Sequence, residues 1–422
     1  TKYRSIVKVV DSNVIVFDPS DDEIVASTAP SSEHEFFKRN AKDIRYGFDH
    51  VFGEDATQRQ VYEATAKPLV KTIMDGFNAS VFAYGATGAG KTYSMIGNEE
   101  AGPGVMVLTM TDLFDEIRRN KLDSRYKIKL SYLEIYNEQV KDLLADDSAP
   151  VTRARALDIR EDSVNGCVVN GLSEHFPATA SQVFDLLDRG NQRRSQSPTD
   201  ANAQSSRSHA VCQITVEQKN RTANVSEQRR IGKLSLIDLA GSERATKNRG
   251  SRFVEGANIN KSLLALGNVI AALSSSARKG GKGGKRHVPY RDSKLTRLLS
   301  ACFGGNSLTT LIICCSSAAY NATETLSTLR FGDRSAKIRN TPTANKVVSA
   351  KELTSRLHEQ QATIAAQAAE IEQLKAALLA MQRGEAGAAF ADMAQRVDRP
   401  RHHAGHGAVT LLVRDVQLSA HD

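Results

Sequence analysis

The chain of 422 residues has no tryptophan, few aromatic residues (6%) and no long apolar run. Its most apolar segment, Leu308–Cys315, has the length of a strand, so no transmembrane span is predicted. The N-terminal residues lack the apolar core of a secretion signal. The five cysteines have no CxxC spacing, which favours buried free thiols in a reducing compartment over disulfides or a metal site. Glycine and proline follow no three-residue period, which excludes a collagen-like fibre.

The positive charge of the chain is concentrated in one window. The net charge is +8, from 56 Lys and Arg against 48 Asp and Glu. Between Arg278 and Arg297 the chain has eight basic residues and one acidic residue, Asp292. Such a patch attracts an acidic partner, which the charge alone leaves open as nucleic acid, anionic lipid or an acidic protein surface. A solvated loop without a partner is the remaining interpretation.

Residues 1–340 alternate between strand-like and helix-like segments. The expected strands are Ser80–Tyr84, Lys127–Tyr136, Val211–Glu217, Gly232–Ile237 and Leu308–Cys315. The expected helices are Gln58–Gly76, Val107–Arg119, Ser181–Asn191, Glu255–Ser274 and Ser293–Ala301. This alternation predicts an α/β domain with a central mixed sheet flanked by helices.

The character of the chain changes after residue 340. The segment 338–350 is predicted to be an extended linker, followed by a helix over 351–383. Apolar residues recur in this helix at seven-residue spacing, namely Leu357, Ile364, Ile371 and Leu378. The spacing predicts a dimerising coiled coil that two glutamines at d positions would weaken, and a lone helix packed on the body is the alternative. Residues 384–422 are expected to be a flexible tail.

The segment Gly85–Thr92 (GATGAGKT) fits the phosphate-loop pattern GxxxxGK[ST]. It follows a strand-like segment and precedes a helix-compatible one, as such a loop must. Its glycines allow backbone N–H groups to wrap phosphates, Lys91 supplies a cation, and the Thr92 hydroxyl can bind Mg²⁺. A glycine-rich turn that binds nothing is the less favoured interpretation.

Two further segments hold side chains suited to a nucleotide with Mg²⁺. Asp238 ends an apolar strand, where a P-loop fold places a carboxylate near the metal, and Gly241 follows with an unobstructed N–H that could sense a γ-phosphate. The segment Asn202–His209 (NAQSSRSH) gathers hydroxyls around Arg207. Each segment alone is also common in structural loops.

In their order and spacing, GATGAGKT, NAQSSRSH and DLAGSE resemble the three nucleotide-sensing motifs of the kinesin motor domain. The segments SYLEIYNEQVKDLL, NINKSLLALGNVIAAL and HVPYRDSKLTRLL are also typical of that family. The resemblance covers residues 3–340 and is strongest to the kinesin-8 class. It implies a kinesin motor domain over 1–340, a neck linker over 338–350 and a neck coiled coil over 351–383.

The resemblance also implies roles for individual residues in binding and hydrolysing ATP. The phosphate loop would comprise Gly85, Ala86, Thr87, Gly88, Ala89, Gly90, Lys91 and Thr92, with Tyr93 stacked on the adenine. Thr92 and Ser206 would bind Mg²⁺, with Asp238 behind them. Switch I would comprise Asn202, Ser205, Ser206, Arg207 and Ser208, and switch II would comprise 238–243. Arg207 and Glu243 would pair to close the site, Gly241 would sense the γ-phosphate, and Ser205 would help to position the attacking water.

The basic window corresponds to the kinesin segment that binds tubulin, so microtubules replace nucleic acid as the expected partner. The expected tubulin contacts are Arg244, Lys247, Arg249, Arg252, Lys279, Lys282, Lys285, Arg286, His287, Tyr290, Arg291, Lys294 and Arg297.

In one respect the sequence departs from the kinesin pattern. Kinesins have a first strand with an RxRP-like motif that cradles the adenine, and Thr1 joins the pattern after that strand. A missing core strand would leave an unpaired sheet edge, and ATP affinity would then be in doubt.

These observations predict a microtubule-stimulated ATPase that moves toward plus ends and that could shorten or cap microtubules. The expected ligands are ATP, ADP and Mg²⁺, and the expected location is the cytoplasmic microtubule cytoskeleton, with the spindle or axoneme as candidates. A kinesin relative that binds microtubules without productive motility is the first alternative. A P-loop ATPase acting on metabolites or nucleic acid is the second, although it leaves SYLEIYNEQ and HVPYRDSKLTRLL unexplained.

Overall fold

The computed structural model describes residues 5–18, 44–122, 124–145, 157–162, 166–195, 206–220, 229–243, 251–278, 287–347 and 350–382. The chain divides into two compact units, Thr1–Ser349 and Ala350–Asp422, and each is described by itself. Within the described residues, no helix is long and apolar enough to cross a membrane. The predicted tail, 384–422, lies outside the described residues.

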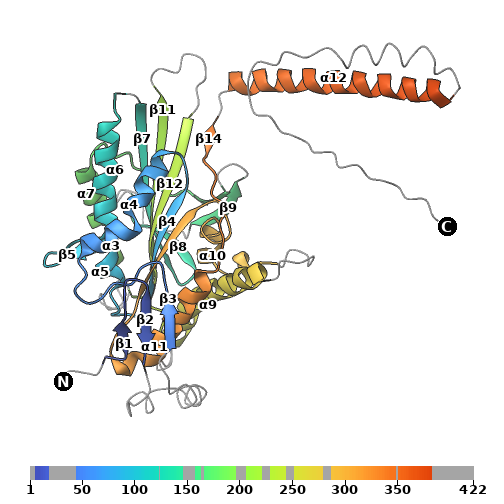
Figure 1. The fold of residues 1–422 in the computed structure, drawn as a ribbon. Coiled ribbons are helices and arrows are strands. Elements are labelled where there is room, and N and C mark those ends of the chain that lie inside the picture. The colour runs from blue at the N-terminus through green and yellow to red at the C-terminus, as the bar shows by residue number, and fades with distance from the viewer. Residues whose placement is uncertain are drawn as a thin grey trace, which may run out of the picture. The chain divides into compact units, whose positions relative to one another are not determined.

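A mixed sheet forms the centre of the first unit (Figure 1). Its strands follow the order β13-β4-β12-β11-β7-β8, and β14 pairs with β12. β4 runs parallel to both β12 and β13, whereas β11 is antiparallel to β12 and β7. The bounds are β4 (Ala79–Gly85), β7 (Ser124–Tyr136), β8 (Gln139–Asp142), β11 (His209–Asn220), β12 (Arg229–Asp238), β13 (Leu308–Cys314) and β14 (Lys346–Val347). The predicted mixed sheet is therefore confirmed.

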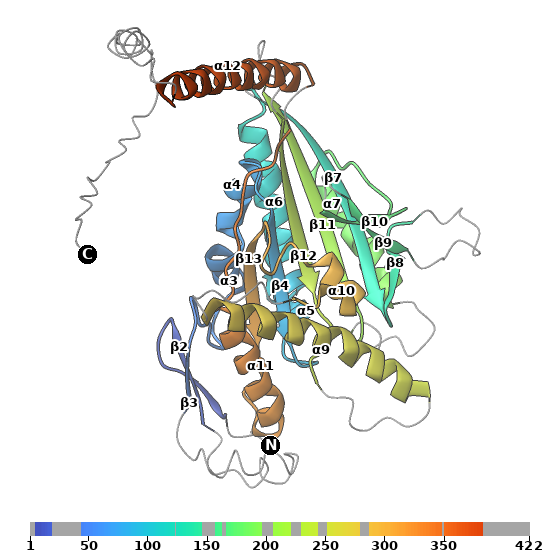
Figure 2. The same ribbon diagram turned by 90° about the vertical axis from the view of Figure 1, so that its right-hand side faces the viewer.

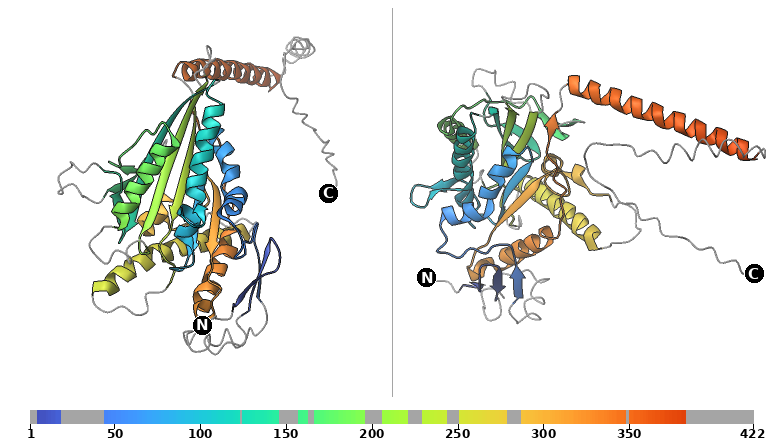
Figure 3. Two further views of the ribbon diagram at one scale, coloured as in Figure 1. Left: turned by 90° about the vertical axis from the view of Figure 1, so that its left-hand side faces the viewer. Right: turned by 45° about the horizontal axis from the view of Figure 1, so that its top comes forward.

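Helices cover both faces of the sheet (Figure 2 and Figure 3). One core lies under α3 (Gln58–Thr65), α4 (Lys67–Met74), α6 (Val105–Arg119) and α7 (Ala180–Ser195). The other lies under α9 (Ser251–Arg278), α10 (Lys294–Leu298) and α11 (Ala322–Ser335). Alternate residues of each strand enter opposite cores, as Val81 and Phe82 of β4 do. The alternation of segments in the sequence thus became a three-layer α/β domain.

Shorter elements complete the unit. They are β1 (Val7–Val9), β2 (Val14–Phe17), β3 (Ile44–Gly47), α5 (Lys91–Ile96), β5 (Gly97–Asn98), β6 (Gly102–Pro103), β9 (Asp158–Asp162), β10 (Gly166–Asn170), and the 3-10 turns η2 (Tyr290–Asp292) and η3 (Ala319–Asn321). β1, β2 and β3 form a separate small sheet that packs on α11.

Two predicted helices have different bounds in the structure. The helix expected over Gln58–Gly76 is two helices, because Pro68 in the first turn of α4 has no N–H to bond back to α3. The helix expected over Ser293–Ala301 is only the five residues of α10, capped by the Ser293 hydroxyl. All five cysteines are free thiols, and Cys212, Cys302 and Cys314 are buried.

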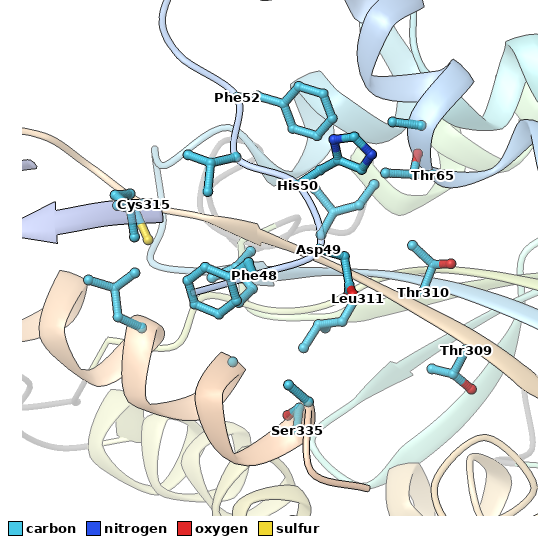
Figure 4. A pocket seen from close by; sticks show the side chains of 18 of the residues that line it. Phe48, Asp49, His50, Phe52, Thr65, Thr309, Thr310, Leu311, Cys315 and Ser335 are labelled. Carbon is cyan, nitrogen blue, oxygen red and sulfur yellow. The ribbon is translucent and has the colours of Figure 1, made fainter. Parts of the chain in front are cut away.

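Among the described residues, β13 pairs with another strand on one side only, that of β4. Along β13 lies a cavity of about 830 Å³, lined by residues of the small N-terminal sheet and of α11. Phe48, Phe52 and Leu311 line it beside Thr309 and Thr310 (Figure 4). That a first strand of the kinesin type belongs at this edge stays a prediction.

The predicted linker runs along the first unit through a series of hydrogen bonds. The Asn340 side chain donates to the carbonyls of Ser307 (2.7 Å) and Cys302 (2.8 Å). The Asn345 side chain donates to Ile231 O (2.9 Å), and its backbone exchanges hydrogen bonds with Gly76 and Ile231. β14 then adds a short strand to β12. Both asparagines therefore hold the linker on the motor core.

The second unit contains one long helix, α12 (Ala350–Gln382). Leu357, Ile364, Ile371 and Leu378 are each at least half exposed on it, from 52% to 64%. These four residues are the predicted a positions. Exposed apolar side chains at this spacing lack the burial that a coiled-coil partner would supply.

Candidate nucleotide site

The phosphate loop lies between β4 and α5, as the sequence predicts. Gly85 ends β4 with φ of +155°, and a Cβ there would lie 2.1 Å from the carbonyl oxygen of Cys314 in β13. Gly90 adopts a left-handed conformation (φ +100°) immediately before α5. Residues with a Cβ would be strained at both positions. The loop therefore needs these glycines for its backbone path as well as for close approach to a phosphate.

Lys91 is buried with its amine turned into the loop. Only 6% of the residue is exposed, and Nζ donates to the carbonyls of Gly85 and Ala86 at 3.0 Å each. Burial lowers the pKa of Lys91, while the carboxylates of Asp238 and Glu243 act in the opposite direction. The amine is thus placed where β- and γ-phosphate oxygens could replace the two carbonyls as acceptors.

Asp238 connects three parts of the site at the carboxyl end of β12. Its Oδ2 accepts hydrogen bonds from Thr92 Oγ1 (2.9 Å) and from Arg194 Nη1 (2.9 Å). Its Oδ1 is buried and has no hydrogen-bond partner. The structure therefore brings the predicted residues Thr92 and Asp238 together.

The orphaned Oδ1 fits a hydrated magnesium ion, because Mg²⁺ keeps several of its waters and a free carboxylate oxygen can accept from one of them. Among the described residues, no three His, Cys, Asp or Glu side chains gather as they would in an all-protein cage. A cation here would depend on hydroxyls, water and phosphates. Ser206, the other predicted ligand, is described and half-buried.

Arg194, in the last turn of α7, belongs to the site although the motifs did not indicate it. Its guanidinium bonds Asp238 and also Ser208, through Nε to Oγ (3.0 Å) and Nη2 to the carbonyl (2.9 Å). Arg194 and Asp238 are buried, at 4% and 3% side-chain exposure. A signal existed in the sequence, since Arg194 lies at helical spacing from the buried Val183 and Leu187. A charge on such a stripe requires a buried partner.

The backbone of switch II is hydrogen-bonded to all the elements around it. Ala240 N–H donates to His209 Nδ1 (3.1 Å), Gly241 N–H to Ser206 O (2.8 Å), and Ser242 N–H to Gly85 O (3.0 Å). The amide predicted to sense a γ-phosphate is therefore bonded to a carbonyl of switch I. A phosphate could reach the Gly241 amide only by replacing that bond.

The Glu243 carboxylate lies on the phosphate loop. Oε2 accepts from the backbone N–H of Thr87 (2.8 Å), and Oε1 accepts from the Thr87 hydroxyl. The pairing predicted between Arg207 and Glu243 thus requires this carboxylate to leave Thr87, and it stays a prediction. Arg207 and Ser208 are described, whereas Asn202 and Ser205 lie outside the described residues. Tyr93 is 47% exposed at the start of α5, as an adenine-stacking side chain must be.

Replacing Gly241 with alanine is expected to prevent this closed arrangement. The added Cβ would lie 2.2 Å from Thr87 Oγ1 and 2.3 Å from Glu243 Oε2. Something must shift, so switch II is expected to move away from the loop and steady-state hydrolysis to fall about 100-fold, as for a small misplacement of reacting groups. Gly267→Ala on α9 is a matched control, because nothing lies within 4 Å of its Cβ. Normal turnover of Gly241→Ala would contradict the expectation.

Five of the predicted tubulin contacts can be placed by their side chains. Arg291 pairs with Glu161 (3.1 Å) and Lys294 with Asp158 (3.7 Å), both acids of the β9–β10 hairpin. The Tyr290 hydroxyl donates to Phe303 O, and Arg297 Nε is buried without a partner. His287 is exposed. Arg291 and His287 are therefore the more accessible of the five.

The remaining predicted contacts cannot be placed in this way. Arg252 lies in α9, where only its backbone is described. The others lie outside the described residues, namely Arg244, Lys247, Arg249, Lys279, Lys282, Lys285 and Arg286.

A phosphate loop that faces a carboxylate on a neighbouring parallel strand defines a P-loop nucleotide-binding domain. The kinesin motor domain family matches residues 7–338, and the chain belongs to that family. It is 46% identical over 347 residues to the mouse kinesin-like protein KIF18A, covering 82% of this chain and 38% of the relative. It is 44% identical over 364 residues to Saccharomyces cerevisiae kinesin-like protein KIP3, covering 80% and 44%. These relatives are kinesin-8 members, as the resemblance predicted.

Solved motor domains have the same fold. A fast kinesin matches with a TM-score of 0.69 and 37% identity, covering 82% of this chain and 90% of that one. KIF14, solved as a dimer with AMP-PNP in complex with a microtubule, matches with a TM-score of 0.69 and 35% identity, covering 82% and 91%. The chain spans about 40% of the length of the curated relatives that it matches.

Proposed function

We propose that this chain is an ATP-driven microtubule motor of the kinesin-8 type. One observation carries the proposal: the three motifs form a single hydrogen-bonded unit, in which switch II bonds switch I through Gly241 and the phosphate loop through Ser242 and Glu243. A γ-phosphate placed among them must change these bonds. Such exchange is what couples a nucleotide to a conformational switch. The related KIF14 structure, which holds AMP-PNP and a microtubule, supports both ligands.

The residues of the site have separate tasks in hydrolysis. The Lys91 amine would bind phosphate oxygens, and the Thr92 and Ser206 hydroxyls would hold Mg²⁺ while Asp238 accepts from its waters. The bound ion neutralises phosphate charge during transfer. Arg207 and Glu243 would close over the γ-phosphate after Glu243 leaves Thr87. Ser205 would position the attacking water, and the closed site would exclude other water.

Two finer activities follow from the class. Movement toward plus ends, and shortening or capping of microtubules, are proposed because the relatives include KIF18A and KIP3. The proposed location is therefore the microtubule cytoskeleton, in the spindle or axoneme. A microtubule-binding relative without productive motility is the second candidate function, and Arg291–Glu161 pairing within the chain favours it to the extent that it withholds a cation from tubulin.

The neck is proposed to form a homodimer. The exposed apolar residues Leu357, Ile364, Ile371 and Leu378 of α12 recur every seven residues, as a coiled-coil seam does. Gln360 and Gln367 at d positions should weaken the pairing. The linker before the helix has bonds that can be broken and remade on the motor core, chiefly those of Asn340 and Asn345.

The test of the proposed function is steady-state ATP hydrolysis with and without polymerised tubulin, with filament length followed by microscopy in the same samples. Strong stimulation with shrinking filaments supports a motor that depolymerises microtubules. Stimulation at constant filament length supports a transport motor. Stimulation by DNA in place of microtubules would contradict the proposal.

Neutralising Lys279, Lys282 and Lys285 together is expected to raise the tubulin concentration for half-maximal stimulation about fivefold at low salt. Each exposed charge contributes only about 0.2–1 kcal/mol, and salt screens it. The measurement is stimulated hydrolysis against tubulin concentration at two ionic strengths. The triple variant of the exposed cations Arg118, Arg119 and Lys121 is the control, since they end α6 on the opposite face of the sheet. Equal effects in both variants would make the three lysines ordinary surface charge.

A further inference from the structure

A buried histidine connects switch II to the helix α9. His209 begins β11 and is 2% exposed. Its Nδ1 accepts the N–H of Ala240 (3.1 Å), and its Nε2 lies 2.8 Å from the Ser262 hydroxyl of α9. Because Nδ1 is an acceptor, the ring proton is on Nε2, which donates to Ser262. One rigid ring thus joins a backbone amide of the nucleotide site to a side chain of α9.

The ring has a single protonation state. Burial, together with the nearby Arg194 and Lys91 cations, lowers the pKa of His209 to about 3. A neutral imidazole is therefore present at any pH at which the protein would work. The two hydrogen bonds keep their directions, and the ring cannot exchange donor for acceptor without breaking both.

The two faces of α9 have different neighbours. Ser262, Leu266 and Val269 lie one below another at helical spacing, and all three are at most 3% exposed against the sheet. The side away from the sheet exposes Lys261, Leu264 and Asn268, and Leu264 is 66% exposed. Figure 2 shows α9 beside α10 and α11 on this face of the sheet. A partner on the outer side of α9 would therefore act on Ser262 through the body of the helix.

Beyond the ring, the route to the phosphate is short. Ala240 directly precedes Gly241, whose N–H bonds Ser206, and Ser242 bonds Gly85 of the phosphate loop. A change in the position of Ala240 must alter the direction of the Gly241 amide. Ser262, the ring and Ala240 are packed without intervening solvent, since all are buried.

We propose that His209 is a positioning residue that keeps the switch II backbone in register with α9, so that a filament bound to the outer side of α9 redirects the Gly241 amide. The inference rests on the proposed function, because it takes the microtubule as the partner of α9. It adds the specific contact, Ser262–His209–Ala240, through which the filament reaches the γ-phosphate. The contact is a discrete element that both sites can bias, as energetic coupling requires.

The test removes the α9 end of the contact with Ser262→Ala and leaves the ring in place. One buried hydrogen bond corresponds to about a three- to tenfold change. Microtubule-stimulated kcat is therefore expected to fall about three- to tenfold, while the half-maximal tubulin concentration and the affinity for fluorescent ADP without filaments stay at wild-type values. The split between kcat and tubulin affinity distinguishes positioning from a general loss of structure. Ser262→Thr, which keeps the hydroxyl, should restore stimulation.

Two comparisons make the test specific. Ser274→Ala is the matched control, because Ser274 is a buried serine of the same helix whose hydroxyl bonds only its own helix, at Ala271 O. It should be stimulated like the wild type. The double variant of Ser262→Ala with His209→Asn should lose no more than His209→Asn alone, since both remove one contact.

The outcomes are separable. A stimulated wild type with an equally stimulated Ser262→Ala overturns this proposal alone, as do additive losses in the double variant or an equal loss in Ser274→Ala. A wild type that filaments do not stimulate overturns the proposed function and this inference with it.

Discussion

Glu243→Ala is expected to lower ATP hydrolysis by about 100-fold or more without loss of nucleotide binding. Closure of the site needs the carboxylate, and misplaced reacting groups cost at least about this factor. The same substitution frees the Thr87 N–H and hydroxyl that the carboxylate now holds. Those donors then become available to a phosphate. The variant should therefore bind ATP at least as tightly as the wild type and remain attached to filaments, as measured by single-turnover hydrolysis and co-sedimentation.

Glu243→Gln separates the two contacts of this side chain. Glutamine can still accept from Thr87 N–H, but it cannot form an ion pair with Arg207. If hydrolysis fails in both variants, the pairing with Arg207 is the essential contact. If Gln retains turnover and Ala does not, the contact with Thr87 is the essential one. Normal turnover in Glu243→Ala would remove this residue from the closing pair.

Arg194→Ala is expected to destabilise the motor domain by about 3–5 kcal/mol, the usual cost of removing one partner from a buried ion pair. Asp238 would keep its bond from Thr92 but would lose its counter-charge in a site where it is 3% exposed. Ser208 would lose both of its contacts with the guanidinium. Urea denaturation followed by circular dichroism measures the free energy of unfolding.

Arg189→Ala is the control for this substitution. It changes an exposed arginine of the same helix and should shift the free energy of unfolding by less than about 0.5 kcal/mol. Arg194→Lys keeps the charge but cannot bond Asp238 and Ser208 at once. It should therefore lie between the wild type and the alanine variant. An Arg194→Ala protein as stable as Arg189→Ala would show that the buried pair contributes no net stability.

The local parts of the site could be predicted because their chemistry is local. A phosphate loop needs glycines where the backbone is left-handed or crowded, and Gly85 and Gly90 are at such positions. The strand before it was recognisable from its apolar run. Helix ends were less predictable, since Pro68 divided one expected helix and α10 kept only five residues. Those bounds depend on packing and capping, which a pattern of apolar residues does not contain.

The contacts between motifs could not be predicted in the same way. Arg194, His209 and Ser262 are far from the phosphate loop in sequence, and none belongs to a nucleotide-binding pattern by its own spacing. They meet because β11 and β12 are antiparallel neighbours and α7 and α9 cover opposite faces of one sheet. Sheet order is decided by which apolar faces can be buried together, and this involves the whole chain.

The sequence by itself determined the family, the α/β class, the phosphate loop and the residue types that a nucleotide with Mg²⁺ requires. These depend on short segments whose backbone freedom and charge are intrinsic to their residues. Only the tertiary structure decided that Glu243 lies on Thr87, that Arg194 neutralises Asp238, and that His209 joins switch II to α9. Each of these contacts pairs buried polar groups from separate elements. Burial makes an unpaired polar group costly, so the partner is chosen by whichever group the fold brings within reach.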